Sequence, residues 1–212
     1  MKMIIAFCFF VLSGCLAFAD DAPENSPYVF GSFQKSVVYL TNGDSTLISM
    51  NYNGVTEELC YNQMGRLMAL DSLDQINRVK IGENLFEPIG GKFYQRIGNF
   101  AQGLFITYKY RLVPPGKLTP YGGASQTTAS TSYIYKPDEG RLYEFILPSD
   151  KILKSKEFLL YKDNQFFKVN KLSQVSKLFP EKAKAIKIFV KTNKLDWSKK
   201  DDVCKIIGFC FE

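Results

Sequence analysis

The spacing of hydrophobic and polar residues changes along the chain. Across residues 37–113, short runs rich in β-branched and aromatic residues alternate with turn residues, a pattern typical of strands. Asn42-Gly43 and Asn53-Gly54 lie between such runs, and Asn-Gly in this position favours a hairpin with a type I′ turn. We therefore expect strands at 37–41, 45–50, 55–64, 66–70, 76–81, 92–97 and 104–112.

Residues 114–132 interrupt the strand pattern. Pro114-Pro115-Gly116 opens this segment, and residues 124–132 contain no large apolar side chain. Such a composition is typical of a loop, so we expect a flexible loop at 114–132. Strand character returns at 133–135 and 142–146.

After Pro148 the pattern predicts one more hairpin and then helices. Runs at 157–161 and 165–169 flank Lys162-Asp163-Asn164, which indicates the hairpin. Beyond it, apolar residues recur three and four positions apart, which predicts three short helices. Pro180 suits the first turn of the second helix.

The third helix has the clearest pattern. Ser198 and Asp201 are spaced as a capping pair at its start. Its apolar positions follow the i, i+3, i+4, i+7 rule and are Val203, Ile206, Ile207 and Cys210. Trp197 precedes the helix and is expected to pack it against a neighbouring element.

The order of these patterns predicts an α+β protein. Its N-terminal part is an antiparallel β-rich body, either a curled sheet or barrel-like, followed by a hairpin and three short Lys-rich C-terminal helices. We expect a signal peptide at 1–19, an N-terminal segment at 20–36, the β-rich body at 37–148, and the hairpin with the helical segment at 149–212.

Residues 1–19 have the composition of an export signal. One basic residue, Lys2, precedes an apolar run at 3–12, which is shorter than the roughly 20 residues that span a bilayer. Ala17-Phe18-Ala19 is a signal peptidase pattern that would leave Asp20 as the first residue. Leu12-Ser13-Gly14-Cys15 instead resembles a bacterial lipobox, in which Cys15 would be lipidated. Both interpretations predict an exported protein, periplasmic or associated with the outer membrane.

Composition narrows the chemistry and locates the charge. None of the 212 residues is histidine, which excludes Ser-His-Asp and Cys-His nucleophiles and metal sites that need imidazole. The net charge is +6. Residues 1–150 hold 12 basic and 14 acidic side chains, for a net of −2, whereas residues 151–212 hold 15 lysines and 7 acids, for +8.

The lysines of the helical segment have two interpretations. They can form the solvated side of amphipathic helices, or they can contact an anionic lipid or polymer at a membrane surface. The segment has no arginine for bidentate phosphate or guanine contacts and the chain is expected to be exported, so no nucleic acid is expected as a partner. The candidate contact residues are Lys182, Lys184, Lys187, Lys191 and Lys194.

The other reactive side chains have ordinary structural explanations. Cys60, Cys204 and Cys210 remain after either cleavage, and an odd number does not indicate a disulfide framework. We expect buried thiols, while a bond from Cys60 to one of the other two stays open. Glu57 and Glu58 are adjacent on a predicted strand, so they would point to opposite faces. No sequence motif indicates a metal site or a cofactor.

One resemblance is carried by four segments. They are residues 38–44, residues 81–86, the basic strand Lys109-Tyr110-Arg111, and the Lys-rich residues 179–195. Together they resemble a broad group of uncharacterised exported proteins of Bacteroidota-type Gram-negative bacteria. The resemblance implies a periplasmic or envelope address, no assigned activity and no functional residues.

These observations favour an exported, non-enzymatic envelope protein that acts as a binding or structural module. The first alternative is a small periplasmic enzyme that uses carboxylate, tyrosine or lysine chemistry without histidine. The second is a protein whose Lys-rich helices contact a polyanion or a membrane surface.

Overall fold

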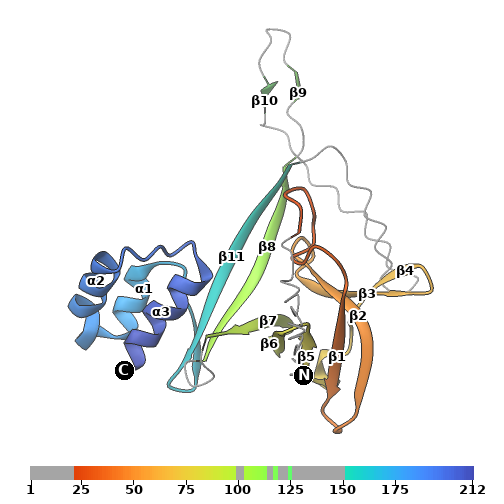
Figure 1. Cartoon of the computed structure of the whole chain (residues 1–212), viewed down its shortest axis with the longest axis horizontal. Coiled ribbons are helices and arrows are strands. Elements are labelled where there is room, and N and C mark those ends of the chain that lie inside the picture. Colours follow the sequence, from red (N-terminus) through yellow and green to blue (C-terminus); the bar gives the residue numbers. More distant parts are fainter. Residues whose placement is uncertain (1–21, 99–102, 114–116, 119–123, 126–150) are drawn as a thin grey trace, which may run out of the picture.

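The computed structural model describes residues 22–98, 103–113, 117–118, 124–125 and 151–212. Ten strands form one antiparallel sheet, and three α-helices follow at the C-terminal end (Figure 1). This arrangement confirms the predicted α+β class with a β-rich body. The expected signal peptide, Cys15 and the strands expected at 133–135 and 142–146 lie outside the described residues.

The sheet is curled and open rather than a closed barrel. Its strand order is β12-β11-β8-β7-β6-β5-β1-β2-β3-β4, with every neighbouring pair antiparallel and with β12 and β4 at the two edges. The strands are β1 (Gln34–Leu40), β2 (Ser45–Asn53), β3 (Glu58–Gln63), β4 (Arg66–Ala69), β5 (Ile76–Ile81), β6 (Asn84–Ile89), β7 (Lys92–Ile97), β8 (Leu104–Val113), β11 (Lys151–Lys162) and β12 (Gln165–Lys168).

Two short strands lie within the loop expected at 114–132. β9 (Lys117–Leu118) and β10 (Ala124–Ser125) pair with each other in an antiparallel manner. The other residues of this loop are outside the described part of the chain.

The first Asn-Gly hairpin and the C-terminal hairpin both form, and only the second has the geometry of a type I′ turn. At the first Asn-Gly, only Gly43 is left-handed, with a φ of 94°, and the Asn42 side chain accepts a hydrogen bond from the Asp44 N–H at 3.0 Å. The C-terminal hairpin has two left-handed residues instead, Asp163 (φ 51°) and Asn164 (φ 61°). Asn and Asp tolerate this conformation better than most residues, so the type I′ geometry occurs there.

The second Asn-Gly does not form a type I′ turn at all. Gly54 is not left-handed, residues 54–57 form the turn, and β3 begins at Glu58. The Tyr110 N–H of β8 donates to the Gly54 carbonyl at 2.7 Å, and the Gly54 N–H donates to the Pro27 carbonyl at 2.8 Å. Gly54 is therefore needed for the close approach to β8, through which the sheet curls.

Strand β6 occupies a place where no strand was predicted. It contains Pro88, and proline within a run argues against a central strand because it lacks an N–H. Phe86 is the last β6 residue that pairs with β5, so Pro88 lies beyond that ladder and removes none of its bonds. The strand continues past this point through its pairing with β7 alone.

The helices are α1 (Leu172–Leu178), α2 (Ala183–Thr192) and α3 (Lys200–Phe211), with a short 3₁₀ helix η3 (Pro180–Lys182) before α2. They gather beside β11 at one end of the sheet (Figure 1). The four apolar positions predicted for α3 are all buried. Pro180 lies in the first turn before α2, as expected.

The predicted cap of α3 is wrong. Lys199 is the N-cap residue and makes no side-chain bond there. The Asp202 carboxylate instead accepts the Asp196 N–H at 3.1 Å, and the Asp196 carboxylate accepts the Ser198 N–H at 2.9 Å. The acids thus stabilise the turn that precedes the helix.

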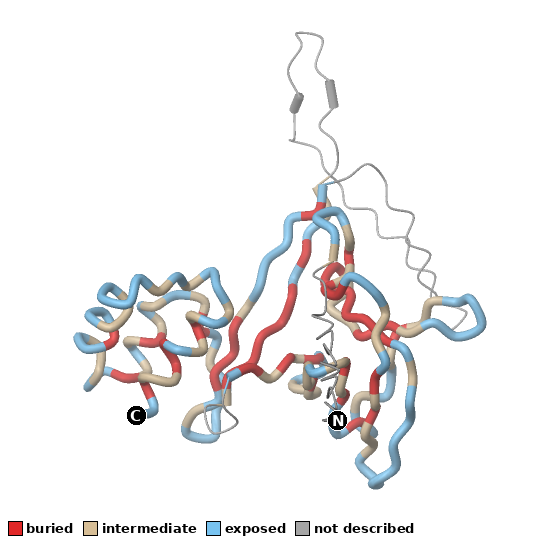
Figure 2. The backbone as a smooth tube through the Cα atoms, viewed as in Figure 1, coloured by how far each residue is buried: buried red, intermediate tan, exposed pale blue. Residues whose placement is uncertain are grey.

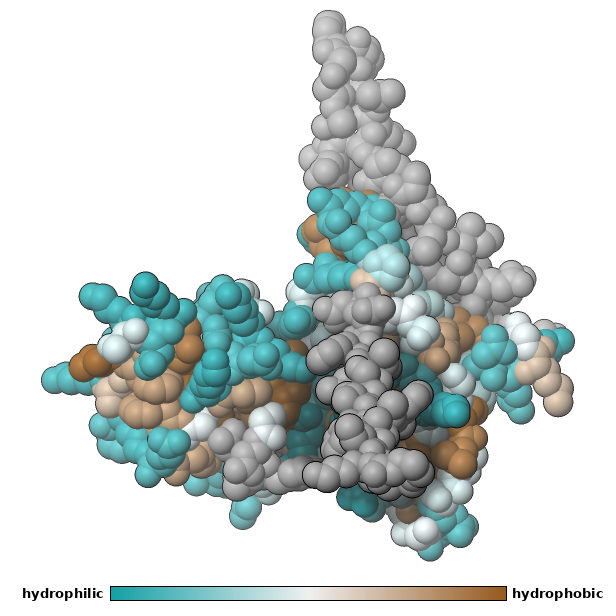
Figure 3. All heavy atoms as spheres, viewed as in Figure 1, coloured by the Kyte–Doolittle hydropathy of each residue, from teal (hydrophilic) through white to brown (hydrophobic). Residues whose placement is uncertain are grey.

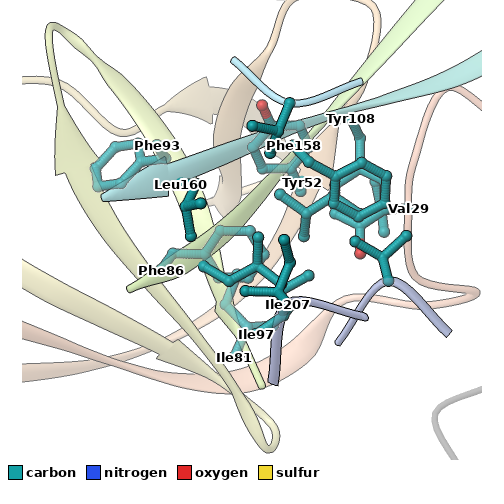
Figure 4. Close-up of a cluster of buried hydrophobic side chains, with 14 of the residues drawn as sticks. Val29, Tyr52, Ile81, Phe86, Phe93, Ile97, Tyr108, Phe158, Leu160 and Ile207 are labelled. Atoms are coloured by element: carbon teal, nitrogen blue, oxygen red, sulfur yellow. The ribbon is translucent and has the colours of Figure 1, made fainter. Parts of the chain in front are cut away.

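One apolar core joins the sheet and the helices. Tyr52 of β2 stacks on Phe86 of β6 with ring centroids 5.6 Å apart. Ile207 of α3 lies near Ile97 of β7 in the same cluster (Figure 4). Trp197 packs edge to face on Phe158 of β11 at 6.0 Å. Buried residues lie on the helices, on β8 and β11 beside them, and on other strands of the sheet (Figure 2).

Candidate functional site

A row of lysines lies on the outer side of α2. The inner side of this helix is fixed by Ile186, which is fully buried, and by Phe189, which stacks on Phe209 of α3 at 4.3 Å. Positions 184, 187 and 191 fall on the other side because the helix has 3.6 residues per turn, and position 194 follows its end. We call these exposed residues the α2 lysine face: Lys184, Lys187, Lys191 and Lys194.

The α2 lysine face is not neutralised by nearby acids. None of its lysines forms an ion pair with another described residue. Glu181 is the only acidic residue between positions 172 and 195. Ile188 lies among the lysines and is 65% exposed. Like charges on one side of a helix add to a positive local potential, which attracts anions. Hydrophilic side chains cover much of the helical part of the molecule (Figure 3).

Lys182 departs from the other predicted contact residues. Its Nζ donates to the Cys210 carbonyl at 3.1 Å, and the residue is half-buried. A cation at the C-terminal end of a helix satisfies a free carbonyl and complements the helix dipole. Lys182 therefore has a structural role at the end of α3, and the structure leaves four of the five candidate lysines on the surface.

A shallow cleft of about 380 Å³ opens between the sheet and the start of α3. Polar and charged side chains supply most of its lining, from the β5–β6 turn, β6, β7 and the first turn of α3: Glu83, Asn84, Gln95, Arg96, Lys200 and Asp201. Cys204 also lines it, and burial raises the pKa of this thiol. The Glu83 carboxylate points away into solvent and pairs with Lys80 at 3.3 Å.

The polar groups beneath the cleft bond to one another. Gln95 is almost fully buried; its amide donates to the Asn84 side-chain oxygen at 2.6 Å, and its own oxygen accepts the Tyr108 hydroxyl at 2.6 Å. A second buried pair joins the Tyr52 hydroxyl to the Thr107 hydroxyl at 2.9 Å. Burial raises the pKa of Tyr52. Because each group has its partner inside the protein, this network stabilises the core.

The Glu57 carboxylate is engaged by two lysines. Glu57 was predicted to lie on a strand beside Glu58, and this prediction is wrong. Glu57 lies in the turn that precedes β3, with a φ of 60°. Its carboxylate accepts the Lys92 Nζ at 2.7 Å and lies 3.9 Å from the Lys109 Nζ. The hydrogen bond to Glu57 raises the pKa of Lys92. The ion pairs continue from Lys109 to Glu157 at 3.8 Å, and they connect the β2–β3 turn to β7, β8 and β11.

The three expected thiols are free. Cys60 and Cys210 are buried, and Cys204 is half-buried. Burial raises the pKa of Cys60 to about 12 and that of Cys210 to about 11. The open alternative of a disulfide from Cys60 is therefore not the state of this structure, and the thiols pack as small apolar groups.

A further cationic surface, which no sequence pattern predicted, lies on the far parts of β8 and β11. β8 pairs with β7 only through Leu104–Ile106, whereas β11 follows β8 as far as Val113. Beyond Ile106 the two strands therefore form a two-stranded extension that rises from the sheet (Figure 1). We call it the basic ribbon, and its cations are Lys109, Arg111, Lys151, Lys154 and Lys156. The available signal was the number of cations on these two strands, which are distant in sequence.

No protein family, curated protein or solved structure matches this chain. The described residues contain no group of three or more His, Cys, Asp or Glu side chains placed to hold a metal ion. Within the same part of the chain, no helix has the length and apolar character needed to cross a membrane.

Proposed function

We propose that this chain is an exported, non-enzymatic protein of the cell envelope that binds an anionic envelope component through the α2 lysine face. Three exposed lysines on one side of α2 and Lys194 just after its end, without an acidic partner among the described residues, support the binding surface. The export pattern at residues 1–19 and the resemblance to exported envelope proteins support the address. Phosphate groups of lipid headgroups and of envelope polymers share the charge that this face would bind.

The expected contact is reversible and depends on salt. A lysine close to an anionic surface contributes about 1 kcal/mol, so the four lysines together contribute about 4 kcal/mol. Screening limits this attraction to a Debye length of about 8 Å at physiological ionic strength. A contact of this kind holds a protein at a surface and needs no catalytic group.

Four of the described acids have partners within the protein. Glu57 and Glu157 are engaged by lysines, and Asp202 accepts a backbone N–H, which holds the pKa of its carboxyl below its usual range. Glu83 at the cleft pairs with Lys80. These contacts give the carboxylates structural roles, so we do not extend the proposal to hydrolysis by paired acids.

The binding surface is tested with the mature protein and two anionic probes. Sedimentation with phosphatidylglycerol vesicles and with purified peptidoglycan sacculi distinguishes lipid from polymer. Changing all four lysines of the face to glutamine is expected to weaken binding about a thousandfold at low salt. The matched variant with four arginines keeps the charge and should bind like the wild type. Equal binding by the glutamine variant would overturn the proposal.

The address is tested by expressing the chain with its own N-terminus in a Gram-negative host. Fractionation and mass spectrometry of the processed protein then read the new terminus. A free amine at Asp20 or an acylated Cys15 supports export and identifies the processing route. Unprocessed protein that begins at Met1 and stays in the cytoplasm contradicts the proposed address.

A further inference from the structure

The basic ribbon concentrates cations on a projecting part of the sheet. Its described residues, 107–113 and 151–157, include five cations and one acid, Glu157, for a net charge of +4. Lys109 pairs with Glu157 at 3.8 Å. Arg111, Lys151 and Lys156 are exposed, and none of them forms an ion pair with another described residue. The far part of β11 is largely exposed (Figure 2).

An exposed apolar side chain lies between these cations. Leu153 is 40% exposed and lies directly opposite Arg111 in the β8–β11 register. Val113, which lies opposite Lys151 on the same face, is only partly buried. Cross-strand neighbours lie about 5 Å apart, so the arginine and the leucine form one small surface. Apolar side chains among cations suit the boundary between headgroups and acyl chains of an anionic bilayer, whereas a soluble polyanion offers only charge.

The N-terminal segment of the chain is held against the same ribbon. The Lys154 Nζ lies 5.4 Å from the centre of the Tyr110 ring and donates to the carbonyls of Pro23 at 2.8 Å and Ala22 at 3.2 Å. Cys15 precedes Ala22 by seven residues, and an extended chain of this length spans at most about 25 Å. Under the lipobox interpretation, a lipid on Cys15 would therefore keep the ribbon close to the bilayer surface.

We infer that the basic ribbon docks on the surface of an anionic lipid bilayer, with Arg111 and Lys151 facing phosphate headgroups and Leu153, on the same face of the ribbon, entering the interface. This inference uses the envelope address of the proposed function but not its α2 lysine face. The two surfaces are separate, so each can be removed without the other. The proposed binding partner is the lipid headgroup region, and the test must distinguish it from an anionic polymer.

The test uses flotation of the purified mature protein with mixed phosphatidylglycerol and phosphatidylcholine vesicles. The ribbon variant is Arg111→Gln with Lys151→Gln; it leaves Lys154 in place because Lys154 holds the N-terminal segment. A cation near an anionic bilayer strengthens binding about fivefold, so we expect the ribbon variant to bind about 25-fold more weakly at low salt. The matched control changes two exposed lysines elsewhere and should lose far less: Lys35 and Lys177.

A second variant separates the bilayer from charge alone. Leu153→Ser keeps every charge of the ribbon, so it also tests the inference if the double variant fails to fold. We expect it to weaken vesicle binding about fivefold and to leave sedimentation with peptidoglycan sacculi unchanged. Equal effects on vesicles and sacculi, or no effect on either, overturn the choice of a bilayer.

The two proposals fail in different ways. Vesicle binding that is lost in the ribbon variant and kept in the α2 glutamine variant supports the ribbon as the membrane surface. The reverse pattern overturns the ribbon and supports the α2 lysine face. Equal vesicle binding by the ribbon variant and its matched control overturns the inference whatever the α2 variant does.

Discussion

Gly54 lies where the turn after β2 meets β8, and its replacement by alanine should disrupt the curl of the sheet. A Cβ at this position would lie 2.5 Å from Cδ2 and 2.6 Å from Cγ of Tyr110, which is closer than real Cβ contacts. The tyrosine ring has little room to move because the residue is 8% exposed and its N–H donates to the Gly54 carbonyl. The backbone of the turn must therefore shift away from β8.

The cost can be worked from the contacts that this shift disturbs. Overpacking of a filled site costs about 1–3 kcal/mol. The two backbone hydrogen bonds of Gly54 contribute about 1 kcal/mol each when they weaken. Alanine stiffens the unfolded chain and returns about 0.5 kcal/mol. We expect Gly54→Ala to lower the free energy of unfolding by about 3 kcal/mol, which moves the urea midpoint by about 1 M.

A double-mutant cycle with Tyr110→Ala decides whether the ring is the cause. Without the ring, the new Cβ has space, so Gly54→Ala should cost less than about 1 kcal/mol in this background. The coupling free energy is then about 2 kcal/mol, measured by urea denaturation of the four proteins. The same cost in both backgrounds, or a loss below about 0.5 kcal/mol in the wild type, would refute the steric argument.

Two further predictions concern Lys182 and the thiols. Lys182→Met should lower the free energy of unfolding by about 1 kcal/mol because the end of α3 loses its donor, while Lys184→Met should stay within about 0.5 kcal/mol; equal effects in urea denaturation would contradict the assignment. Burial raises the pKa of Cys60 to about 12, so a thiol reagent at neutral pH should label Cys204 first and Cys60 only after unfolding, as read by peptide mapping. Since the unfolded thiol ionises at lower pH, the stability that Cys60 contributes is present below the ordinary thiol value of 9.0 and is lost as the pH rises towards 12. Equal labelling rates for the two native thiols would argue against this account.

Sequence patterns predicted those features that depend on residues close together in the chain. The hairpin at Asp163-Asn164 and the apolar face of α3 follow from residues close together in sequence, and both were predicted. The turn at Gly54 was misassigned because its geometry is set by Pro27 and Tyr110, which are remote in sequence. An Asn-Gly pair favours a type I′ turn only when the flanking strands are free to choose it.

Long-range contacts also explain why the sequence did not predict the position of Glu57 or strand β6. Glu57 was placed on a strand, but its contact with Lys92 lies 35 residues away and accompanies a left-handed turn conformation. Strand β6 was missed because the cost of Pro88 depends on where the β5–β6 ladder ends. A sequence pattern does not show which lysine an acid pairs with, or at which residue the pairing of two strands ends. These features are known only from the folded structure.

The net charge of the C-terminal segment follows from its composition, but the exposure of each lysine depends on the fold. Composition places a net +8 in residues 151–212 but does not say which lysines are available. Pairing with acids engages Lys162, Lys168 and Lys205. Helical spacing predicted Lys184, Lys187 and Lys191 as exposed, but it did not show that Lys182 bonds to the end of α3. Lys151 and Arg111 share one face with Leu153 only because β8 and β11 pair in this register, which the sequence of either strand does not contain.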